Sequence, residues 1–206
     1  MKNRLVVVSN RLPITINQVG DNWQIKPGAG GLITALAPLM KTNQGIWVGW
    51  PGCGADAPVD DLVESFAKAQ GYSLKPVPLT QDEVEKYYRG FSNEALWPLF
   101  HDLLGHCIFS HDNYRVYDAV NRRFAQITAE ASSDEDIVWI HDYQLISSGW
   151  YLRQLHPRRK IAFFLHIPFP SPDLFRRLPW SKQLLVSLLA YDLVGFQTLR
   201  DHRNFI

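Results

Sequence analysis

Residues 137–166, IVWIHDYQLISSGWYLRQLHPRRKIAFFLH, contain the pattern that decides the fold. The apolar runs at 137–140 and 161–165 have the length and composition of strands that are buried on both faces. Between them, at about 145–155, the apolar residues follow the spacing of a helix. Two buried strands joined by a helix are typical of a parallel sheet, because the helix returns the chain to the edge at which the first strand began.

The same alternation of strand and helix runs through the rest of the chain. Apolar runs typical of strands lie at 5–8, 46–50, 74–79 and 193–196, and helical patterns lie at 32–40, 60–70, 93–103, 114–128, 173–178 and 182–190. The runs at 14–16 and 23–25 flank a polar turn at 19–22 and predict a β-hairpin. Thr80 and Glu83 form a capping-box pattern that opens a further helix, and another helix starts at Thr198. No repeat or linker interrupts this order, so we predict one α/β domain over residues 1–206, with a doubly wound, mostly parallel, Rossmann-like sheet.

Composition and charge exclude several classes of protein. The 206 residues include 21 Lys and Arg and 20 Asp and Glu, so the formal net charge of +1 predicts no binding to nucleic acid or to an anionic membrane. The apolar run after the basic N-terminus is too short for a signal peptide or a membrane span. Cys53 and Cys107 lack the spacing of a metal site and predict reduced thiols. We therefore expect a cytoplasmic protein.

Ligands of a doubly wound sheet bind beyond the carboxyl ends of its strands. One basic residue lies at such a position, and a glycine-rich segment that does not directly follow a strand is a second candidate. Arg11 follows the first apolar run and can hold a phosphate or carboxylate through two guanidinium nitrogens, although an exposed Arg without a role or a structural ion pair is the alternative. The glycine-rich segment 28–31 precedes a helix. Its backbone N–H groups can therefore approach an anion, although its spacing is not that of a dinucleotide or P-loop motif and a flexible turn is the alternative.

Polar side chains also end the two strands of the opening segment. His141 and Asp142 follow the run at 137–140, and His166 follows the run at 161–165. Such groups are costly at the end of a buried strand unless they serve a site or have partners. His and Asp are metal ligands, but no further ligand lies at a suggestive spacing, so we predict no metal. A capping Asp with two structural histidines is the other interpretation.

Taken together, these segments resemble the trehalose-6-phosphate synthase family. The matching segments are VVVSNR at 6–11, GGL at 30–32, WVGW at 47–50, YY at 87–88, FSN at 91–93, LWP at 96–98, WIHDY at 139–143, FLHIPFP at 164–170 and YDLVGFQT at 191–198. Each segment alone is weak, but they follow the family's order across essentially the whole chain.

The resemblance implies the N-terminal domain of a GT-B type glycosyltransferase, an enzyme with two Rossmann-like halves. Members of the family transfer glucose, with retention, from UDP-glucose or another nucleotide glucose to glucose-6-phosphate in trehalose biosynthesis. They need no metal or other cofactor. The leaving diphosphate can take the proton of the acceptor, so the protein mainly positions charge and excludes water. The sequence leaves a homo-oligomer open.

The resemblance also implies which residues bind the acceptor. Arg11 would hold the phosphate, with help from the hydroxyl of Tyr88 and the indole N–H of Trp97. Asp142 would accept hydrogen bonds from the sugar hydroxyls. Taken alone, each of Tyr88 and Trp97 fits ordinary packing in the core better than a ligand contact.

Three further residues would face the donor. His166 would lie against the donor glucose, and Gly30 and Gly31 would offer backbone N–H groups to its diphosphate. The predicted catalytic residues are therefore His166 and Asp142, which lie where donor and acceptor would meet.

The family continues through a second, donor-binding domain, whereas this sequence ends at residue 206. We expect the residues of that domain to lie outside this chain and the chain alone to be inactive. Two other functions stay open. In a glucosylglycerol-phosphate synthase, the acceptor glycerol-3-phosphate would need Arg11 but would make less use of Asp142. A non-catalytic regulatory subunit would keep only the binding of sugar phosphate.

Overall fold

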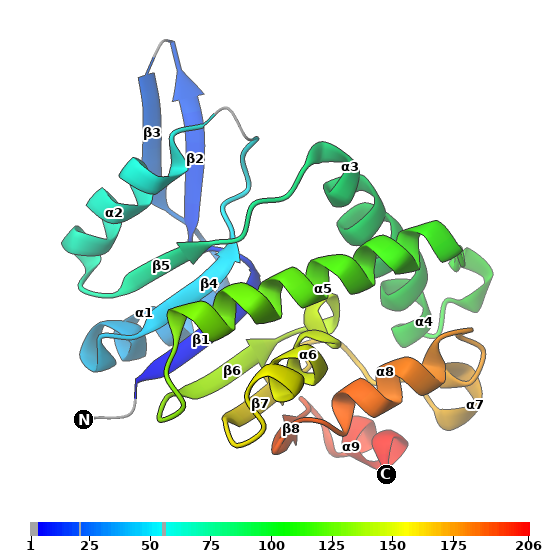
Figure 1. Cartoon of the computed structure of the whole chain (residues 1–206). Coiled ribbons are helices and arrows are strands. Elements are labelled where there is room, and N and C mark those ends of the chain that lie inside the picture. Colours follow the sequence, from blue (N-terminus) through cyan, green and yellow to red (C-terminus); the bar gives the residue numbers. More distant parts are fainter. Residues whose placement is uncertain (1–3, 21, 55–56) are drawn as a thin grey trace.

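A six-stranded parallel sheet forms the centre of the computed structural model, which describes residues 4–20, 22–54 and 57–206 (Figure 1). The order of the strands is β5-β4-β1-β6-β7-β8. Their bounds are β1 (Leu5–Arg11), β4 (Ile46–Trp50), β5 (Ser73–Pro76), β6 (Ile137–His141), β7 (Lys160–Phe164) and β8 (Leu193–Gly195). The chain therefore builds the sheet from β1 outward in one direction and then returns to extend it in the other, which confirms the predicted doubly wound sheet.

The central strand β1 is buried on both faces, as its uninterrupted apolar run predicts. It pairs in parallel with β4 on one side and with β6 on the other, so that Val7 lies beside both Trp47 and Trp139. Successive side chains of a strand point to opposite faces of a sheet. Val6 and Val8 accordingly belong to one hydrophobic core and Val7 belongs to the other.

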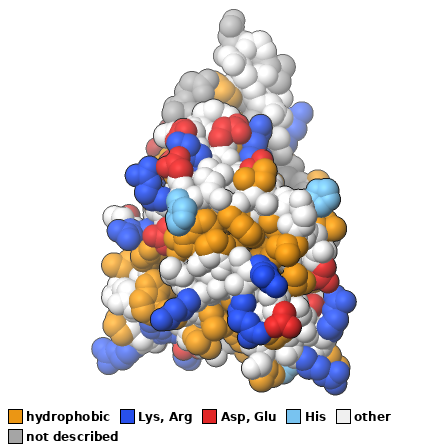
Figure 2. All heavy atoms as spheres, turned by 90° about the vertical axis from the view of Figure 1, so that its right-hand side faces the viewer, with side chains coloured by type: hydrophobic (Ala, Val, Ile, Leu, Met, Phe, Trp, Pro, Cys, Tyr) orange, Lys and Arg blue, Asp and Glu red, His pale blue; other side chains and the backbone are white. Residues whose placement is uncertain are grey.

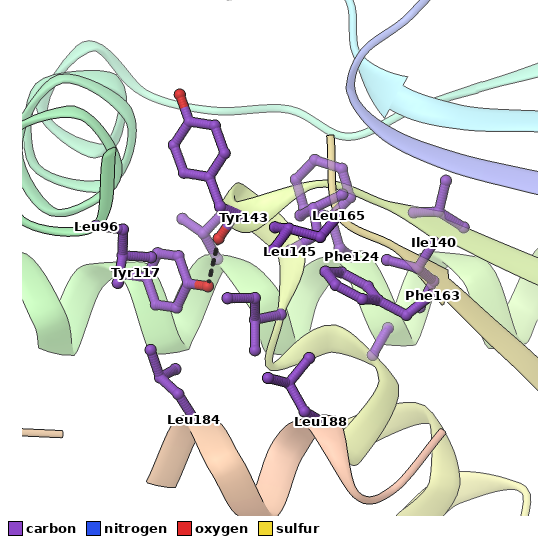
Figure 3. Close-up of a cluster of buried hydrophobic side chains, with 14 of the residues drawn as sticks. Leu96, Tyr117, Phe124, Ile140, Tyr143, Leu145, Phe163, Leu165, Leu184 and Leu188 are labelled. Carbon is purple, nitrogen blue, oxygen red and sulfur yellow. Dashed lines mark hydrogen bonds between the residues drawn. The ribbon is translucent and has the colours of Figure 1, made fainter. Parts of the chain in front are cut away.

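Helices cover both faces of the sheet (Figure 1). On the face of Val7 lie α1 (Gly31–Asn43) and α2 (Val59–Gln70), which contribute Leu36 and Phe66 to that core. The larger core, on the other face, is covered by α5 (His111–Ala131), α6 (Ser148–Leu155) and α8 (Ser181–Leu188). Figure 3 shows part of this core, where Phe124 of α5 and Leu188 of α8 surround side chains from β6 and β7. Two short helices lie near the C-terminus: α7 (Pro172–Phe175) and α9 (Leu199–Phe205).

The predicted β-hairpin forms a separate two-stranded antiparallel sheet of β2 (Ile14–Val19) and β3 (Asn22–Pro27). It projects from the end of β1 at the top of Figure 1. Its predicted turn includes Asp21, which lies outside the described residues. β5 ends at Pro76, and the last hydrogen bond between it and β4 runs from the N–H of the next residue, Val77, to the carbonyl of Gly49. The predicted strand at 74–79 is therefore too long.

A continuous helical stretch covers residues 81–100, between β5 and α5. Thr80 caps α3 (Gln81–Glu83) through both hydrogen bonds of the predicted capping box. The chain then continues through a π-helix, η1 (Val84–Leu96), into α4 (Trp97–Phe100). The two helices expected after Thr80 and at 93–103 form one stretch, since η1 runs through residues 91–93, where the hydroxyl of Ser92 donates to the carbonyl of Tyr87, five residues earlier. A π-helix has a wider turn than an α-helix and is frequent at functional sites.

Two 3₁₀ turns remain, η2 (Leu104–His106) after α4 and η3 (Tyr143–Leu145) after β6. The predicted helix at 145–155 is accordingly shorter than expected, since α6 begins at Ser148. In the part of the chain that the structure describes, none of the helices is both long enough and apolar enough to cross a membrane.

Candidate functional site at the β1–β6 switch point

A cavity of about 390 Å³ lies at the carboxyl ends of β1, β6 and β7. The connections after β1 and β6 leave toward opposite edges of the sheet, and such a switch point opens a crevice in which doubly wound proteins bind ligands. The volume is within the range of small-molecule sites. The cavity brings together five of the seven predicted site residues: Arg11, Gly30, Gly31, Asp142 and His166.

Arg11 is the last residue of β1, and its side chain is held without a neutralising partner. The guanidinium carbon lies 4.7 Å from the centre of the Trp50 ring, within the range of a cation–π interaction. Among the described residues, no carboxylate lies within 4.0 Å of this guanidinium, so the alternative of a structural ion pair finds no partner there. Arg11 is exposed, as the other alternative expects. Gly52 leaves room for the side chain, since a methyl group at that position would collide with the guanidinium. Arg11 is therefore oriented by an aromatic ring while its charge stays available to an anion.

The glycine-rich segment supplies the second wall of the cavity. Gly30 caps the N-terminus of α1 and has a φ of 147°, and Gly31 begins the helix. An added methyl group would meet no atom within 4 Å at either residue, so both approach the cavity unobstructed. The first N–H groups of a helix have no partner within it, and the first turn of α1 contains no acidic side chain. Gly28 differs, because a methyl group there would lie 2.9 Å from Ile33, which gives it a packing role.

Asp142 directly follows β6 and has a strained backbone conformation. Its φ of 75° and ψ of 165° fall in a region that favours glycine and costs another residue about 1–3 kcal/mol. One carboxylate oxygen, Oδ1, accepts hydrogen bonds from the backbone N–H of Tyr143 at 3.0 Å and of His166 at 3.2 Å. Burial raises the pKa of Asp142, although these N–H groups and the nearby His166 ring oppose the shift. The side chain is thus fixed through one oxygen at a backbone cost that suggests a functional constraint.

The rings of His141, at the end of β6, and His166, just after β7, are neighbours, with their centres 5.3 Å apart. Nδ1 of His141 is 3.0 Å from Nε2 of His166, so the two rings share a hydrogen bond. Burial, together with the neighbouring His166, lowers the pKa of His141 to about 3. Burial also lowers the pKa of His166, while Asp142 acts in the opposite direction. Both rings are therefore neutral near pH 7. Within the described ranges, no group of three or more His, Cys, Asp or Glu is arranged to hold a metal ion.

Tyr88 and Trp97 lie on the helical stretch beside the cavity and do not line it. Tyr88 belongs to η1 and is half-buried. Trp97 begins α4, is 40% exposed, and stacks its ring on His101 with ring centres 4.1 Å apart. The structure therefore gathers five of the seven predicted residues and leaves these two on a neighbouring element.

Two hydrogen bonds attach η1 to the switch point. The hydroxyl of Tyr87 donates to Oδ1 of Asn10 at 3.0 Å, and that of Tyr143 donates to Oδ1 of Asn93 at 2.9 Å. Asn10 precedes Arg11 and Tyr143 follows Asp142, so η1 is attached beside both. These supports, and the roles of Trp50 and Gly52, were not predicted from the sequence. The FSN segment at 91–93 carried a signal only through the family resemblance.

The family model described as Glycosyltransferase family 20 matches residues 3–206. The chain belongs to this family. Over 202 residues it is 45% identical to the trehalose-6-phosphate synthase of Mycobacterium sp. (strain JLS), which covers 98% of the chain. It is 44% identical to the trehalose-6-phosphate synthase of Mycobacterium avium (strain 104), again over 98% of the chain. The chain spans 41% of the length of either relative.

Two solved structures extend the similarity to the fold. One is an α,α-trehalose-phosphate synthase (UDP-forming) from Burkholderia xenovorans in complex with glucose-6-phosphate. It aligns with 98% of this chain and 42% of its own, at 31% identity and a TM-score of 0.78. The other is described as trehalose-6-phosphate from E. coli bound with UDP-2-fluoro glucose, and aligns over the same shares at 36% identity and a TM-score of 0.82. The predicted family and α/β fold class are confirmed.

Proposed function

We propose that this chain is the N-terminal, acceptor-binding part of a retaining glycosyltransferase that transfers glucose from a nucleotide glucose, such as UDP-glucose, to glucose-6-phosphate. The observation that carries the proposal is the pair of opposite charges in one cavity. Arg11 and Asp142 both line it, and neither has an ion-pair partner within 4.0 Å among the described residues. A ligand with a phosphate at one end and hydroxyls at the other satisfies both charges.

We assign the binding of the acceptor to Arg11 and Asp142. The guanidinium of Arg11 matches the geometry of a phosphate and donates two hydrogen bonds to it. Asp142 keeps Oδ2 free of hydrogen bonds to the described residues, so this oxygen can accept from sugar hydroxyls. Tyr88 is proposed as a further acceptor contact because Tyr87, next to it, is bonded to Asn10 beside Arg11. Trp97 is also proposed as an acceptor contact. This requires that the acceptor extends from the cavity to the start of α4.

We assign the binding of the donor to the wall of the cavity that the glycine-rich segment forms. The open N–H groups at Gly30 and Gly31, at the positive end of α1, suit the diphosphate of a nucleotide sugar. His166 is neutral and is proposed to contact the donor glucose. The chain contributes no general base, because the leaving diphosphate takes the proton of the acceptor hydroxyl. Its residues orient the two substrates and stabilise charge as it develops.

A titration calorimetry experiment tests the assignment of Arg11. We expect glucose-6-phosphate to bind the wild-type chain, and Arg11→Ala to weaken binding by roughly 10- to 100-fold, since a charge-assisted contact contributes about 1.5–3 kcal/mol. Arg115→Ala is the matched control, because Arg115 is an arginine of α5 whose side chain is 80% exposed. Equal affinities of wild type and Arg11→Ala would contradict the role of Arg11.

The same titration distinguishes the alternative acceptor. Asp142→Asn should weaken the binding of glucose-6-phosphate and leave that of glycerol-3-phosphate unchanged if Asp142 accepts from sugar hydroxyls. A chain that prefers glycerol-3-phosphate would instead support a glucosylglycerol-phosphate synthase.

Because the chain spans 41% of its relatives, we propose that it does not catalyse the transfer alone. The residues that complete the donor site are expected in the remainder of the family's length. The assay is release of UDP from UDP-glucose, with and without glucose-6-phosphate. Release that depends on glucose-6-phosphate, from this chain by itself, would overturn this part of the proposal.

A further inference from the structure

His166 is held at three of its four polar atoms. Its backbone N–H donates to Oδ1 of Asp142 at 3.2 Å, and its carbonyl accepts from Nε2 of Gln197 at 2.7 Å. Its ring nitrogen Nε2 lies 3.0 Å from Nδ1 of His141. The fourth polar atom, Nδ1, has no hydrogen-bond partner among the described residues, and it is not one of their buried unpaired atoms. Since His166 lines the cavity, Nδ1 is the atom that it offers to a ligand.

The environment of His141 decides which ring donates in the shared hydrogen bond. His141 is 1% exposed, packs against the Trp139 ring, and has its Nε2 buried without a partner. If His166 donated, the single proton of neutral His141 would sit on Nε2 and would be a buried N–H without an acceptor. If His141 donates from Nδ1, only a lone pair is left unpaired. Buried N–H groups without a partner are rarer in proteins than buried acceptors without one, so donation by His141 is the favoured arrangement.

We infer that His141 is a positioning residue, which donates its Nδ1–H to Nε2 of His166 and thereby keeps the proton of His166 on Nδ1, facing the cavity. His166 is then a neutral hydrogen-bond donor, and Nδ1 cannot act as a base. Its ligand atom is an acceptor oxygen, from a sugar hydroxyl or a phosphate. This identification of the ligand rests on the proposed function, whereas the position of the proton does not.

The position of the proton can be measured in the wild-type chain without ligand. Long-range ¹H–¹⁵N correlation spectra of histidine-labelled protein near pH 7 separate protonated from bare ring nitrogens. We expect His166 to carry its proton on Nδ1 and His141 to do the same. A wild-type His166 that carries its proton on Nε2 would overturn the inference.

Two variants of His141 separate positioning from packing. His141→Asn places an amide N–H near the former Nδ1 and should preserve the tautomer of His166. His141→Phe keeps an aromatic ring against Trp139 but removes the donor, so His166 should shift toward the Nε2–H form that a free neutral imidazole prefers. Backbone amide spectra report whether each variant is folded. A folded His141→Phe chain with an unchanged His166 tautomer would contradict the role of His141. If that variant does not fold, the spectra of wild type and His141→Asn decide.

Adding UDP-glucose to the wild-type chain then tests the ligand contact separately. A shift of the Nδ1–H resonance of His166 supports it. The expected tautomer without any ligand-induced shift would count against the proposed function and leave the assignment of His141 standing.

Discussion

Arg11 and Asp142 carry opposite charges at the ends of neighbouring strands and do not pair with each other within 4.0 Å. Each is held by groups that leave its charge in place. Arg11 lies over the face of Trp50, and Asp142 accepts from two backbone N–H groups. A structural ion pair would have cancelled both charges, so the arrangement favours a ligand that meets them separately.

A substitution of Gly52 tests how the orientation of the Arg11 side chain is maintained. Gly52→Ala should weaken the binding of glucose-6-phosphate at least tenfold, because the new methyl group would collide with the guanidinium. It should destabilise the fold only by the roughly 1–2 kcal/mol that a left-handed backbone costs, since Gly52 has a φ of 81° and the end of the Arg11 side chain can move away. Calorimetry and urea denaturation measure the two effects.

Gly20 provides a matched control for this substitution. It has a φ of 61°, but its added methyl group would meet no atom within 4 Å. Gly20→Ala should therefore show the cost of the backbone alone, with unchanged binding. If both variants bind as wild type does, Gly52 does not position Arg11.

At the scale of elements, Asp136 joins the amino ends of β1 and β6. Its carboxylate accepts from the backbone N–H and guanidinium of Arg4 and from the N–H of Ser133, and its side chain is 3% exposed. Burial alone would raise the pKa of Asp136, but these hydrogen bonds lower it from 3.8 to about 2. The native state therefore binds this proton less readily than the unfolded chain does, which stabilises the fold above about pH 4.

We expect Asp136→Asn to lower the free energy of unfolding by about 2 kcal/mol at pH 7, from the size of this pKa shift. The difference between wild type and variant should shrink as the pH falls from about 4 toward 2, where the wild-type carboxylate becomes protonated. Urea denaturation at pH 7 and pH 3 measures it. Asp173→Asn is the control, because Asp173 pairs with Arg176 on the surface and is 90% exposed. A difference that does not change with pH would contradict this account of Asp136.

The strands could be predicted well because burial on both faces leaves uninterrupted apolar runs. The run at 46–50 matches β4 at both ends. Helices after Thr80 and at 93–103 could be predicted, but not that η1 joins them into one stretch, since the five-residue spacing of its hydrogen bonds leaves no clear pattern in the sequence. The location of the site followed from strand ends alone, at Arg11, Asp142 and His166. The cation–π contact of Arg11 could not be predicted, because it depends on how β1 and β4 bring two side chains together.

At the scale of the whole molecule, the surface carries an apolar band in addition to the cavity. Figure 2 shows a band of hydrophobic side chains across the face that lies on the right in Figure 1, the side of α4 and α7. The connection from α4 to α5 contains the exposed residues Leu103, Leu104, Ile108 and Phe109. Contiguous apolar surface is typical of interaction sites. A homo-oligomer, left open by the sequence, stays a prediction, to be measured by sedimentation of the chain.

The central claim is that the cavity at the β1–β6 switch point binds a sugar phosphate. Titration of the ¹⁵N-labelled chain with glucose-6-phosphate, followed through its backbone amide resonances, tests it most directly because weak binding is still detected. We predict saturable shifts at three separate segments, residues 9–12, 30–32 and 141–142, which line this cavity together. No saturable shifts in these segments, or shifts confined to another part of the surface such as the groove beside Trp150 and Lys182, would contradict the claim.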